Sequence, residues 1–356
     1  MASTYDRRLV DLLELELPII QAPMAGVATP ALAAAVSNAG GLGSLGLATS
    51  TATAAREMIG ALRAQSNRAF NVNVFCHKPA VADPAVEAAW IEQLRPEFER
   101  LGAEPPSRLT LLWKSFLEDD DMFAMLLEEK PRVVSFHFGL PSPERISAMK
   151  SAGIILFASA TNLAEARAVA AAGIDAVVAQ GYEAGGHRGL FDPDGPDEQL
   201  GTMALTRVLV RNLDIPVIAA GGIMDGAGIA AALRLGAAAA QLGTAFIACP
   251  ESQADEGYRQ ALRSEAAHHT VLTRVISGRP ARCLSNRFTA LGASVSPGDL
   301  PAYPLTYDAG KALAAAAKAA GVAGYGAHWA GQGAPLARAV PAATLMSQLA
   351  AELEAG

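Results

Sequence analysis

Residues 174–189 read IDAVVAQGYEAGGHRG, an apolar β-branched run followed by a glycine-rich loop that carries His187. A run of this kind is typical of a buried parallel strand, and the chemistry of an α/β barrel lies at the carboxyl ends of its strands. Glycines let a loop approach a ligand closely, and an imidazole can take or give a proton near neutral pH. We interpret His187 as a catalytic residue, because a core histidine does not require the flanking Gly185-Gly186 pair and Arg188.

The same alternation of a short β-type run and an alanine-rich helical stretch extends in both directions from this strand. Eight candidate strands cover residues 17–21, 41–45, 70–75, 133–138, 154–158, 176–180, 216–220 and 239–243. Helical stretches are expected between them, for example over residues 30–39, 54–64, 162–172 and 225–235. This alternation predicts an α/β fold, a (β/α)8 TIM barrel, over an open doubly wound sheet.

Two stretches are too long to be simple barrel connections. Residues 76–130 carry extra helical material, and residues 251–324 follow the eighth strand with helices and loops. We expect the barrel, as the cofactor-binding domain, over residues 1–250, and a smaller, mainly helical substrate-covering domain over residues 251–324. The last segment, residues 325–356, is expected to return to the barrel exterior, because residues 346–353 have helical spacing.

One glycine pattern invites a different interpretation. Gly41-Leu-Gly43-Ser-Leu-Gly46 has the spacing of a dinucleotide-binding fingerprint. These glycines overlap the predicted strand itself, whereas the fingerprint requires them in the turn between a strand and a helix. We therefore do not expect a Rossmann nucleotide site here.

Composition excludes several classes of partner. The 356 residues are 51% apolar and 18% charged, with a net charge of −7 and no lysine–arginine cluster, so nucleic-acid binding is not expected. Cys76, Cys249 and Cys283 are far apart, which favours a reducing, cytoplasmic compartment over a disulfide framework. No metal-ligand spacing, signal-peptide core or credible membrane span is visible, and the oligomeric state is left open.

Glycines after the last two candidate strands predict a phosphate site. Gly221 and Gly222 follow the seventh strand, and Gly243-Thr244 follows the eighth. Such loops expose backbone N–H groups near a helix start, at the corner where barrels commonly bind phosphate. Simple tight turns are the alternative interpretation of each loop alone. Amide side chains at other strand ends, Asn73 and Gln180, could bond a flat, flavin-like ring.

Several motifs together resemble one enzyme family. They are QAPMAGVATP from residue 21, NVNVFCH from residue 71, GYEAGGHRG, AAGGI, QLGTAF, YPLTYDAGK from residue 303 and AGQG from residue 330. These motifs, spread from about residue 15 to residue 335, are similar to those of the class I nitronate monooxygenases, formerly 2-nitropropane dioxygenases. The tyrosine-rich stretch combined with GYEAGGHRG is the most specific part of the resemblance.

The resemblance implies an FMN-dependent (β/α)8 barrel that oxidises alkyl nitronates, with propionate 3-nitronate as the best guess. The implied reaction uses O2, passes through a flavosemiquinone, consumes no reduced nicotinamide and gives malonic semialdehyde with nitrite and nitrate. His187 would be the catalytic histidine. The implied cofactor-binding residues are Ala22, Pro23, Met24, Asn73, Gln180, Gly185, Gly221, Gly222, Gln241, Gly243, Thr244 and Gln332.

A polar substrate cluster is implied as well: Tyr258, Tyr303, Tyr307 and Lys311. Phenol hydroxyls and an ammonium group suit an anion that carries nitro and carboxylate groups. Tyr307 and Lys311 are four residues apart and would share a helix face. Some relatives carry a tyrosine where this chain has Trp113, which leaves an aromatic wall with only an N–H donor.

Two other functions stay open at this point. An NADH-dependent FMN enoyl-acyl-carrier-protein reductase or quinone reductase would use the same barrel and a similar histidine loop. A flavin- or phosphate-binding protein without turnover is the third possibility, which the histidine on its glycine loop disfavours. Fold alone does not decide among these functions.

Overall fold

Eight parallel strands form the centre of the molecule in a computed structural model that describes residues 5–355. Met1–Thr4, at the start of the expected barrel domain, and Gly356, at the end of the expected C-terminal segment, lie outside the described residues. The strands are β1 (Ile19–Gln21), β2 (Gly43–Gly46), β3 (Phe70–Phe75), β4 (Val133–His137), β5 (Ile155–Ala160), β6 (Ala176–Gln180), β8 (Val217–Ala220) and β9 (Ala239–Leu242).

The sheet closes on itself as a barrel. Its strand order is β1-β9-β8-β6-β5-β4-β3-β2, and a parallel bridge between Ile20 and Leu42 joins its two ends. Gln21 N donates to Leu42 O at 3.0 Å across that seam. All eight predicted strands are confirmed, with ends that shift by up to two residues, because each run is buried on both faces and is rich in small or β-branched apolar residues.

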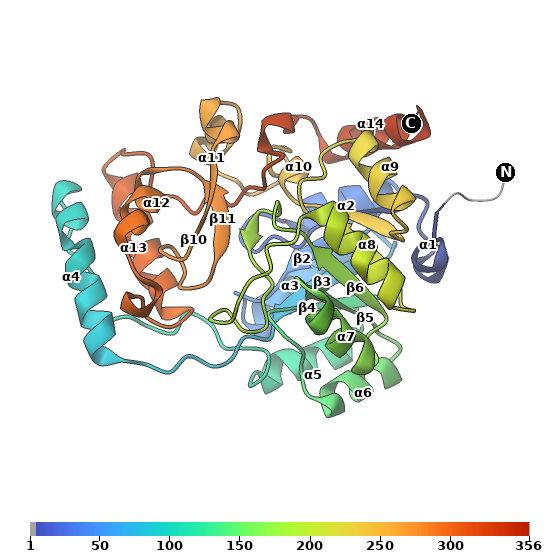
Figure 1. The fold of residues 1–356 in the computed structure, drawn as a ribbon, viewed down its shortest axis with the longest axis horizontal. Helices are drawn as coiled ribbons and strands as arrows, with labels where there is room; N and C mark the ends of the chain where they lie inside the picture. The colour runs from blue at the N-terminus through green and yellow to red at the C-terminus, as the bar shows by residue number, and fades with distance from the viewer. Residues whose placement is uncertain (1–4, 356) are drawn as a thin grey trace.

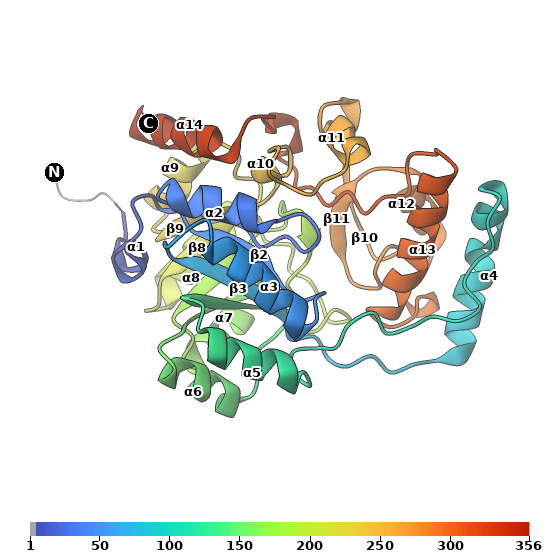
Figure 2. The same ribbon diagram turned by 180° about the vertical axis from the view of Figure 1, so that it is seen from behind.

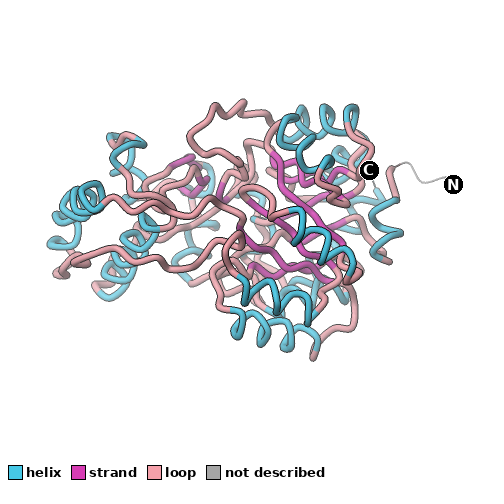
Figure 3. The backbone as a smooth tube through the Cα atoms, turned by 90° about the horizontal axis from the view of Figure 1, so that it is seen from below, coloured by secondary structure: helices cyan, strands magenta, loops and turns pink. Residues whose placement is uncertain are grey.

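Helices surround the barrel (Figures 1 and 2). They are α2 (Pro30–Asn38), α3 (Ala52–Arg63), α5 (Asp120–Glu129), α6 (Pro143–Ser151), α7 (Leu163–Ala171), α8 (Thr202–Asn212) and α9 (Gly226–Arg234). The predicted helix start at residue 162 is confirmed, since Asn162 Oδ1 accepts from Glu165 N at 2.9 Å. Figure 3 shows the barrel strands enclosed by this layer of helices.

One end of the barrel is filled and the other is left open. Helix α1 (Arg8–Leu13) contributes Leu9 and Leu13 to a buried cluster that includes Ile20, Phe157 and Ile218 inside the barrel. Helix α14 (Ala342–Ala355) packs on α2 and α9 of the barrel, with Met346 in their shared core.

A second group of elements lies over the carboxyl ends of the strands (Figure 1). After α10 (Thr244–Ile247) the chain forms α11 (Glu256–Leu262), η1 (Glu265–His268), β10 (Thr270–Thr273), β11 (Ala281–Leu284), α12 (Arg287–Leu291), η2 (Gly292–Ser294), η3 (Pro297–Asp299) and α13 (Leu305–Ala319), followed later by η4 (Ala334–Leu336). We call α4 (Pro84–Arg100), α11, α12, α13, β10 and β11 the cover.

The cover is built from two distant parts of the chain. Trp90 and Phe98 of α4 pack in one apolar cluster with Phe288 and Leu313 of the later segment, and Tyr325 Oη donates to Glu97 of α4. The sequence had placed α4 only as extra helical material and had not predicted β10 and β11. The contiguous domain over residues 251–324 therefore omits α4, and a separate covering domain stays a prediction.

Three further findings bear on the predicted exclusions. The first concerns Gly43, which belongs to the glycine pattern that has the spacing of a dinucleotide-binding fingerprint. A Cβ atom at Gly43 would lie 1.9 Å from Ala33 O, so this glycine permits close contact of β2 with α2. No described helix is long and apolar enough to cross a membrane. Within residues 5–355, no group of three or more His, Cys, Asp or Glu side chains could hold a metal ion.

Candidate active site

A cavity of about 280 Å³ lies between the open end of the barrel and the cover. It brings together almost all the predicted site residues: Ala22, Pro23, Met24, Asn73, Gln180, Gly185, His187, Gly221, Gly222, Gln241, Gly243, Thr244, Tyr258, Tyr303, Tyr307 and Lys311. Gln332 is the exception, since it is exposed and its backbone N–H donates to Glu183 O at 2.9 Å. Its neighbours Gly331 and Gly333 line the cavity instead.

His187 lies where the barrel meets the cover. With Gly186 it forms β7 (Gly186–His187), which pairs with β11 so that His187 is opposite Ala281. Its Nε2 is 2.9 Å from Ser277 Oγ, and that hydroxyl donates its single proton to Arg279 O at 3.2 Å. Ser277 must then accept from His187, which places the proton on Nε2 and leaves Nδ1 as an acceptor.

The backbone of the histidine loop is held from the barrel. Gln180 Nε2 donates to His187 O at 2.9 Å, and Gln180 Oε1 accepts from Gly189 N at 2.7 Å. His137 Nε2 lies 3.1 Å from the same carbonyl oxygen of His187, and its Nδ1 lies 2.9 Å from Ser159 Oγ. Gln180 was predicted to bind a cofactor; it lines the cavity, but two of its polar atoms position the loop.

The histidines of the site are neutral at physiological pH. Burial, with the charge of Arg279 as a smaller contribution, lowers the pKa of His187 to about 3 and the pKa of His137 to about 4. A neutral imidazole keeps a lone pair that can accept a proton or a hydrogen bond from a ligand. His187 is therefore suited to accept a hydrogen bond from a ligand, and its low pKa makes it a weak base unless an anionic ligand raises that pKa.

The cover side of the cavity offers donors without partners. Tyr303 Oη and Trp113 Nε1 are buried, and among residues 5–355 neither meets the geometry of a hydrogen bond with another group, although the two side chains interact with each other. Lys311 Nζ lies 5.5 Å from the centre of the Trp113 ring and 5.7 Å from that of Tyr307, and forms no ion pair within the described residues. Since buried donors are costly to leave unpaired, this wall is suited to a ligand that brings acceptor oxygens.

The predicted substrate residues Tyr307, Lys311 and Tyr258 all lie on that wall, but Tyr258 differs from the other two in its hydrogen bonding. Tyr307 and Lys311 lie on one face of α13, as their spacing predicted. Tyr258 also lines the cavity, but its hydroxyl donates to Trp329 O and its ring stacks on His328 at 4.6 Å. Its proton is thus already used in holding Trp329, whose ring lies 5.1 Å from that of His187.

The barrel side is made of backbone and small side chains. Gly221 and Gly222 adopt φ angles of +124° and +70°, which favour glycine. Thr244 Oγ1 accepts from Gly331 N at 3.0 Å, and Asn73 Nδ2 donates to Ser135 Oγ at 2.9 Å. No Asp or Glu is among the described residues that line the cavity. This lining fits a flat ring with a phosphate group, because nothing in it repels an anion.

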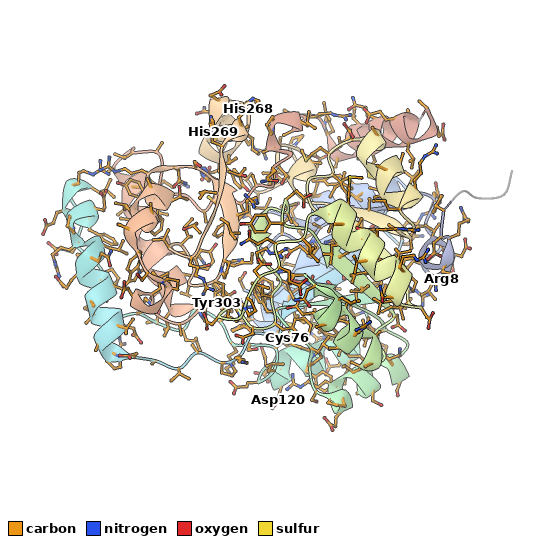
Figure 4. All side chains as sticks on the ribbon, in the orientation of Figure 1. Arg8, Cys76, Asp120, His268, His269 and Tyr303 are labelled. Carbon is orange, nitrogen blue, oxygen red and sulfur yellow. The ribbon has the colours of Figure 1, made fainter. Side chains whose placement is uncertain are left out.

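Several other polar residues have no place in the proposed reaction. Burial raises the pKa of the Cys76 thiol, which argues against a thiolate nucleophile. The Glu183 carboxylate accepts from Thr202 N and Oγ1 and is structural. Figure 4 shows His268 and His269 at the outer edge of the cover, away from Tyr303.

Sequence reasoning missed Ser277 and Trp329 and did not place His137 among the site residues. Ser277 contacts a histidine 90 residues earlier in the chain, and nothing local to SGRP signals that contact. His137 does fill a structural role, but its position at the end of β4 also places it in the cavity wall.

Comparison with known proteins shows similarity over almost the whole chain. Residues 6–352 match the family model described as nitronate monooxygenase. The chain is 62% identical over 351 residues to a nitronate monooxygenase of Paraburkholderia phytofirmans, covering 99% of this chain and 96% of the relative. It is 55% identical over 348 residues to a nitronate monooxygenase of Pseudomonas aeruginosa, covering 97% and 99%.

Solved structures show the same similarity. A nitroalkane oxidase from Streptomyces ansochromogenes matches with a TM-score of 0.89 and 43% identity, covering 98% of each chain. FabK from Thermotoga maritima matches with a TM-score of 0.73 and 31% identity, covering 98% of this chain and 96% of that one. The chain therefore belongs to the flavin-dependent nitronate monooxygenase family and is an enzyme of that activity.

Proposed function

We propose that this enzyme oxidises propionate 3-nitronate with FMN and O2, giving malonic semialdehyde with nitrite and nitrate. The observation that carries the proposal is the contrast between the two walls of one cavity. Glycine loops free of carboxylates face a wall with two unpartnered buried donors and an ammonium group that forms no ion pair. A ligand with a nitro group at one end and a carboxylate at the other satisfies both kinds of group.

The barrel wall is proposed to hold the FMN. Gly221, Gly222, Gly243 and Thr244 would supply backbone and hydroxyl donors to its single phosphate. Ala22, Pro23, Met24, Asn73, Gln180, Gly185 and Gln241 would surround its ring. The chemistry supplied by bound FMN is the acceptance of electrons from the nitronate and their delivery to O2. Gln332, being exposed, would act only through its glycine neighbours.

The cover wall is proposed to bind and orient the anion. Tyr303 and Trp113 would donate to the nitro oxygens, and Lys311 would pair with the carboxylate. Tyr307 would shape the wall between them, and Tyr258 would act by holding Trp329 in place. His187 would face the reacting carbon, and its free Nδ1 would take a proton when a neutral nitroalkane is offered.

Two broader properties are proposed on the same basis. The cover would act as a substrate-binding unit whose main segment is residues 251–324, with the barrel over residues 1–250 and the returning segment over 325–356. Three free, buried cysteines support a reducing, cytoplasmic environment.

The experiment is a product analysis on the purified yellow protein. Mass spectrometry of the chromophore released by heat should identify FMN rather than another flavin. Incubation with propionate 3-nitronate in air should yield malonic semialdehyde, together with nitrite and nitrate. A protein that carries a different flavin, or that leaves this nitronate unchanged while oxidising simple alkyl nitronates, would contradict the proposal.

A further inference from the structure

Arg279 is a buried cation that the roles above do not use. It lies in the loop before β11 and is 4% exposed, yet no carboxylate forms an ion pair with it anywhere in residues 5–355. Its Nη2 donates to Leu190 O, while its buried Nε has no partner. Burying an unpaired charge is costly, so a guanidinium left in this state indicates a purpose other than stability.

The other buried arginines of this region are differently satisfied. Arg188 pairs with Asp197 at 2.8 Å. Arg282 also lacks an ion pair, but its Nε and Nη2 donate to Tyr182 O at 3.1 and 2.9 Å, and its Nη1 donates to a threonine hydroxyl. Arg279 is thus distinguished from both by an unused donor and by a charge that Asp192 and Asp194 offset only from a distance, without an ion pair.

The charge of Arg279 is separated from the cavity by one aromatic ring. Its Cζ lies 4.1 Å from the centre of the Phe138 ring. On its edges that ring contacts two cavity-lining residues, His187 and Tyr303, each with a centroid separation of 5.6 Å. The face of an aromatic ring attracts a cation, so Phe138 holds the guanidinium behind the cavity wall.

The backbone of Phe138 adopts a strained conformation. Its φ angle is +72°, a left-handed conformation that is rare for a bulky aromatic residue. Such strain persists where the surroundings over-determine it, and it concentrates at functional sites. The strained turn after β4 therefore fixes the ring between the cation and the cavity.

We propose that Arg279 is a specificity-determining residue whose buried charge makes the cavity select an anionic nitronate over the neutral nitroalkane of the same shape. The inference rests on the proposed placement of the nitronate in this cavity. It adds to Lys311, because Lys311 is exposed and would meet the distal carboxylate, whereas Arg279 lies behind the His187–Tyr303 end.

The protonation behaviour of the neighbours agrees with a positive potential at this place. The charge of Arg279 adds to burial in lowering the pKa of His77, His137 and His187. It opposes the effect of burial on Tyr303, whose pKa burial raises. The contribution of Arg279 to each of these pKa values has the sign expected of a nearby cation, while burial is the larger cause in every case.

The test uses two ligands that differ by one charge. Butyrate and 1-nitropropane have nearly the same shape, since a carboxylate and a nitro group are isosteric, and calorimetry on the flavin-loaded protein measures both without turnover. Arg279→Met should weaken butyrate about tenfold, the effect of one unit charge at about 10 Å with an effective dielectric constant of about 20. 1-Nitropropane should change less than about twofold, and Arg279→Lys should retain butyrate binding.

Arg282→Met is the matched control for losing a buried arginine, and it should leave the ratio of the two affinities unchanged.

If Arg279→Met does not fold, two other variants test the inference. Arg279→Gln keeps a donor for Leu190 O, and Lys311→Met leaves Arg279 intact. Butyrate should then still bind at least as tightly as 1-nitropropane. Equal weakening of both ligands in Arg279→Met or Arg279→Gln, unchanged butyrate binding there, or complete loss of butyrate binding in Lys311→Met would overturn the proposal. Because neither ligand is propionate 3-nitronate, these outcomes are independent of whether that nitronate is the substrate.

Discussion

The two walls of the cavity are built from different materials. On the barrel side, the contacts come from glycine loops and from side chains that already form hydrogen bonds within the barrel or its loops, such as Asn73 through Nδ2 and Gln180 through both of its polar atoms. On the cover side, they come from aromatic rings and the ammonium group of Lys311, and the buried donors of Tyr303 and Trp113 have no hydrogen bond of regular geometry within residues 5–355. A paired wall is rigid before any ligand arrives, whereas an unpaired wall is completed only by a ligand with acceptor oxygens.

Because of this difference, the barrel wall is suited to bind the flavin and the cover wall to bind the substrate. The barrel wall provides shape and backbone donors, and it is suited to hold a flavin tightly in one orientation. The cover wall provides charge and free donors, and it is suited to choose among small anions. His187 belongs to both, because its backbone is held from the barrel and its strand pairs with β11 of the cover.

Replacement of His187 removes the residue on which both walls converge, so the largest effect is expected there. His187→Asn should lower turnover with nitronate by at least about 100-fold, the usual scale for loss of a positioned acid–base or charge-binding group. Flavin content should stay normal, because the loop backbone is held by Gln180 and His137 rather than by the imidazole. Steady-state oxygen uptake and the visible spectrum check both parts. Unchanged turnover would remove His187 from the mechanism.

A substitution that strains the barrel wall should mainly weaken flavin binding. A Cβ atom at Gly221 would lie 2.7 Å from Thr202 Oγ1 and 3.1 Å from Ala184 N, at a φ angle of +124°. Gly221→Ala should weaken flavin binding about 30-fold, within the range of energies for such strained conformations. Equilibrium dialysis of the flavin measures this loss.

The control for that change is Gly60→Ala. Gly60 lies in α3, and a Cβ atom there would meet nothing within 4 Å. This variant should bind flavin as the wild type does. Normal flavin affinity in Gly221→Ala would mean that the loop after β8 does not approach the cofactor.

Changes in the cover wall should affect the substrate and spare the flavin. Lys311→Met should raise the KM for propionate 3-nitronate about tenfold, because one exposed ion pair with the substrate carboxylate is lost. The KM for an alkyl nitronate without a carboxylate should change much less. Lys318→Met, at the far end of the same helix, is the matched control. A similar rise in KM for both nitronates would contradict the carboxylate-binding role.

Much of the barrel wall could be predicted because its signals are local. Each strand and the glycines after it are adjacent in sequence, and the chemistry of an α/β barrel lies at the carboxyl ends of its strands. Gln332 differs from its neighbours: it stands between Gly331 and Gly333, which line the cavity, but it is exposed and does not line the cavity itself. A motif identifies a loop more reliably than the direction of each side chain in it.

The cover wall depends on contacts between distant segments. Ser277, Arg279 and Phe138 act on His187 or its neighbours from loops that the sequence does not connect. Helix α4 joins the later segment through apolar packing that only the folded chain creates. Tyr303, Tyr307 and Lys311 were found through family resemblance, since their residue types alone suited a surface helix equally well.

Oxygen uptake by the purified yellow protein, with propionate 3-nitronate in one cell and NADH in a parallel cell, tests the central claim most directly. The account predicts fast uptake with the nitronate and none with NADH, because the cover wall is completed by a small anion. Uptake driven by NADH alone would contradict it and would place the chain with the flavin reductases that share this barrel.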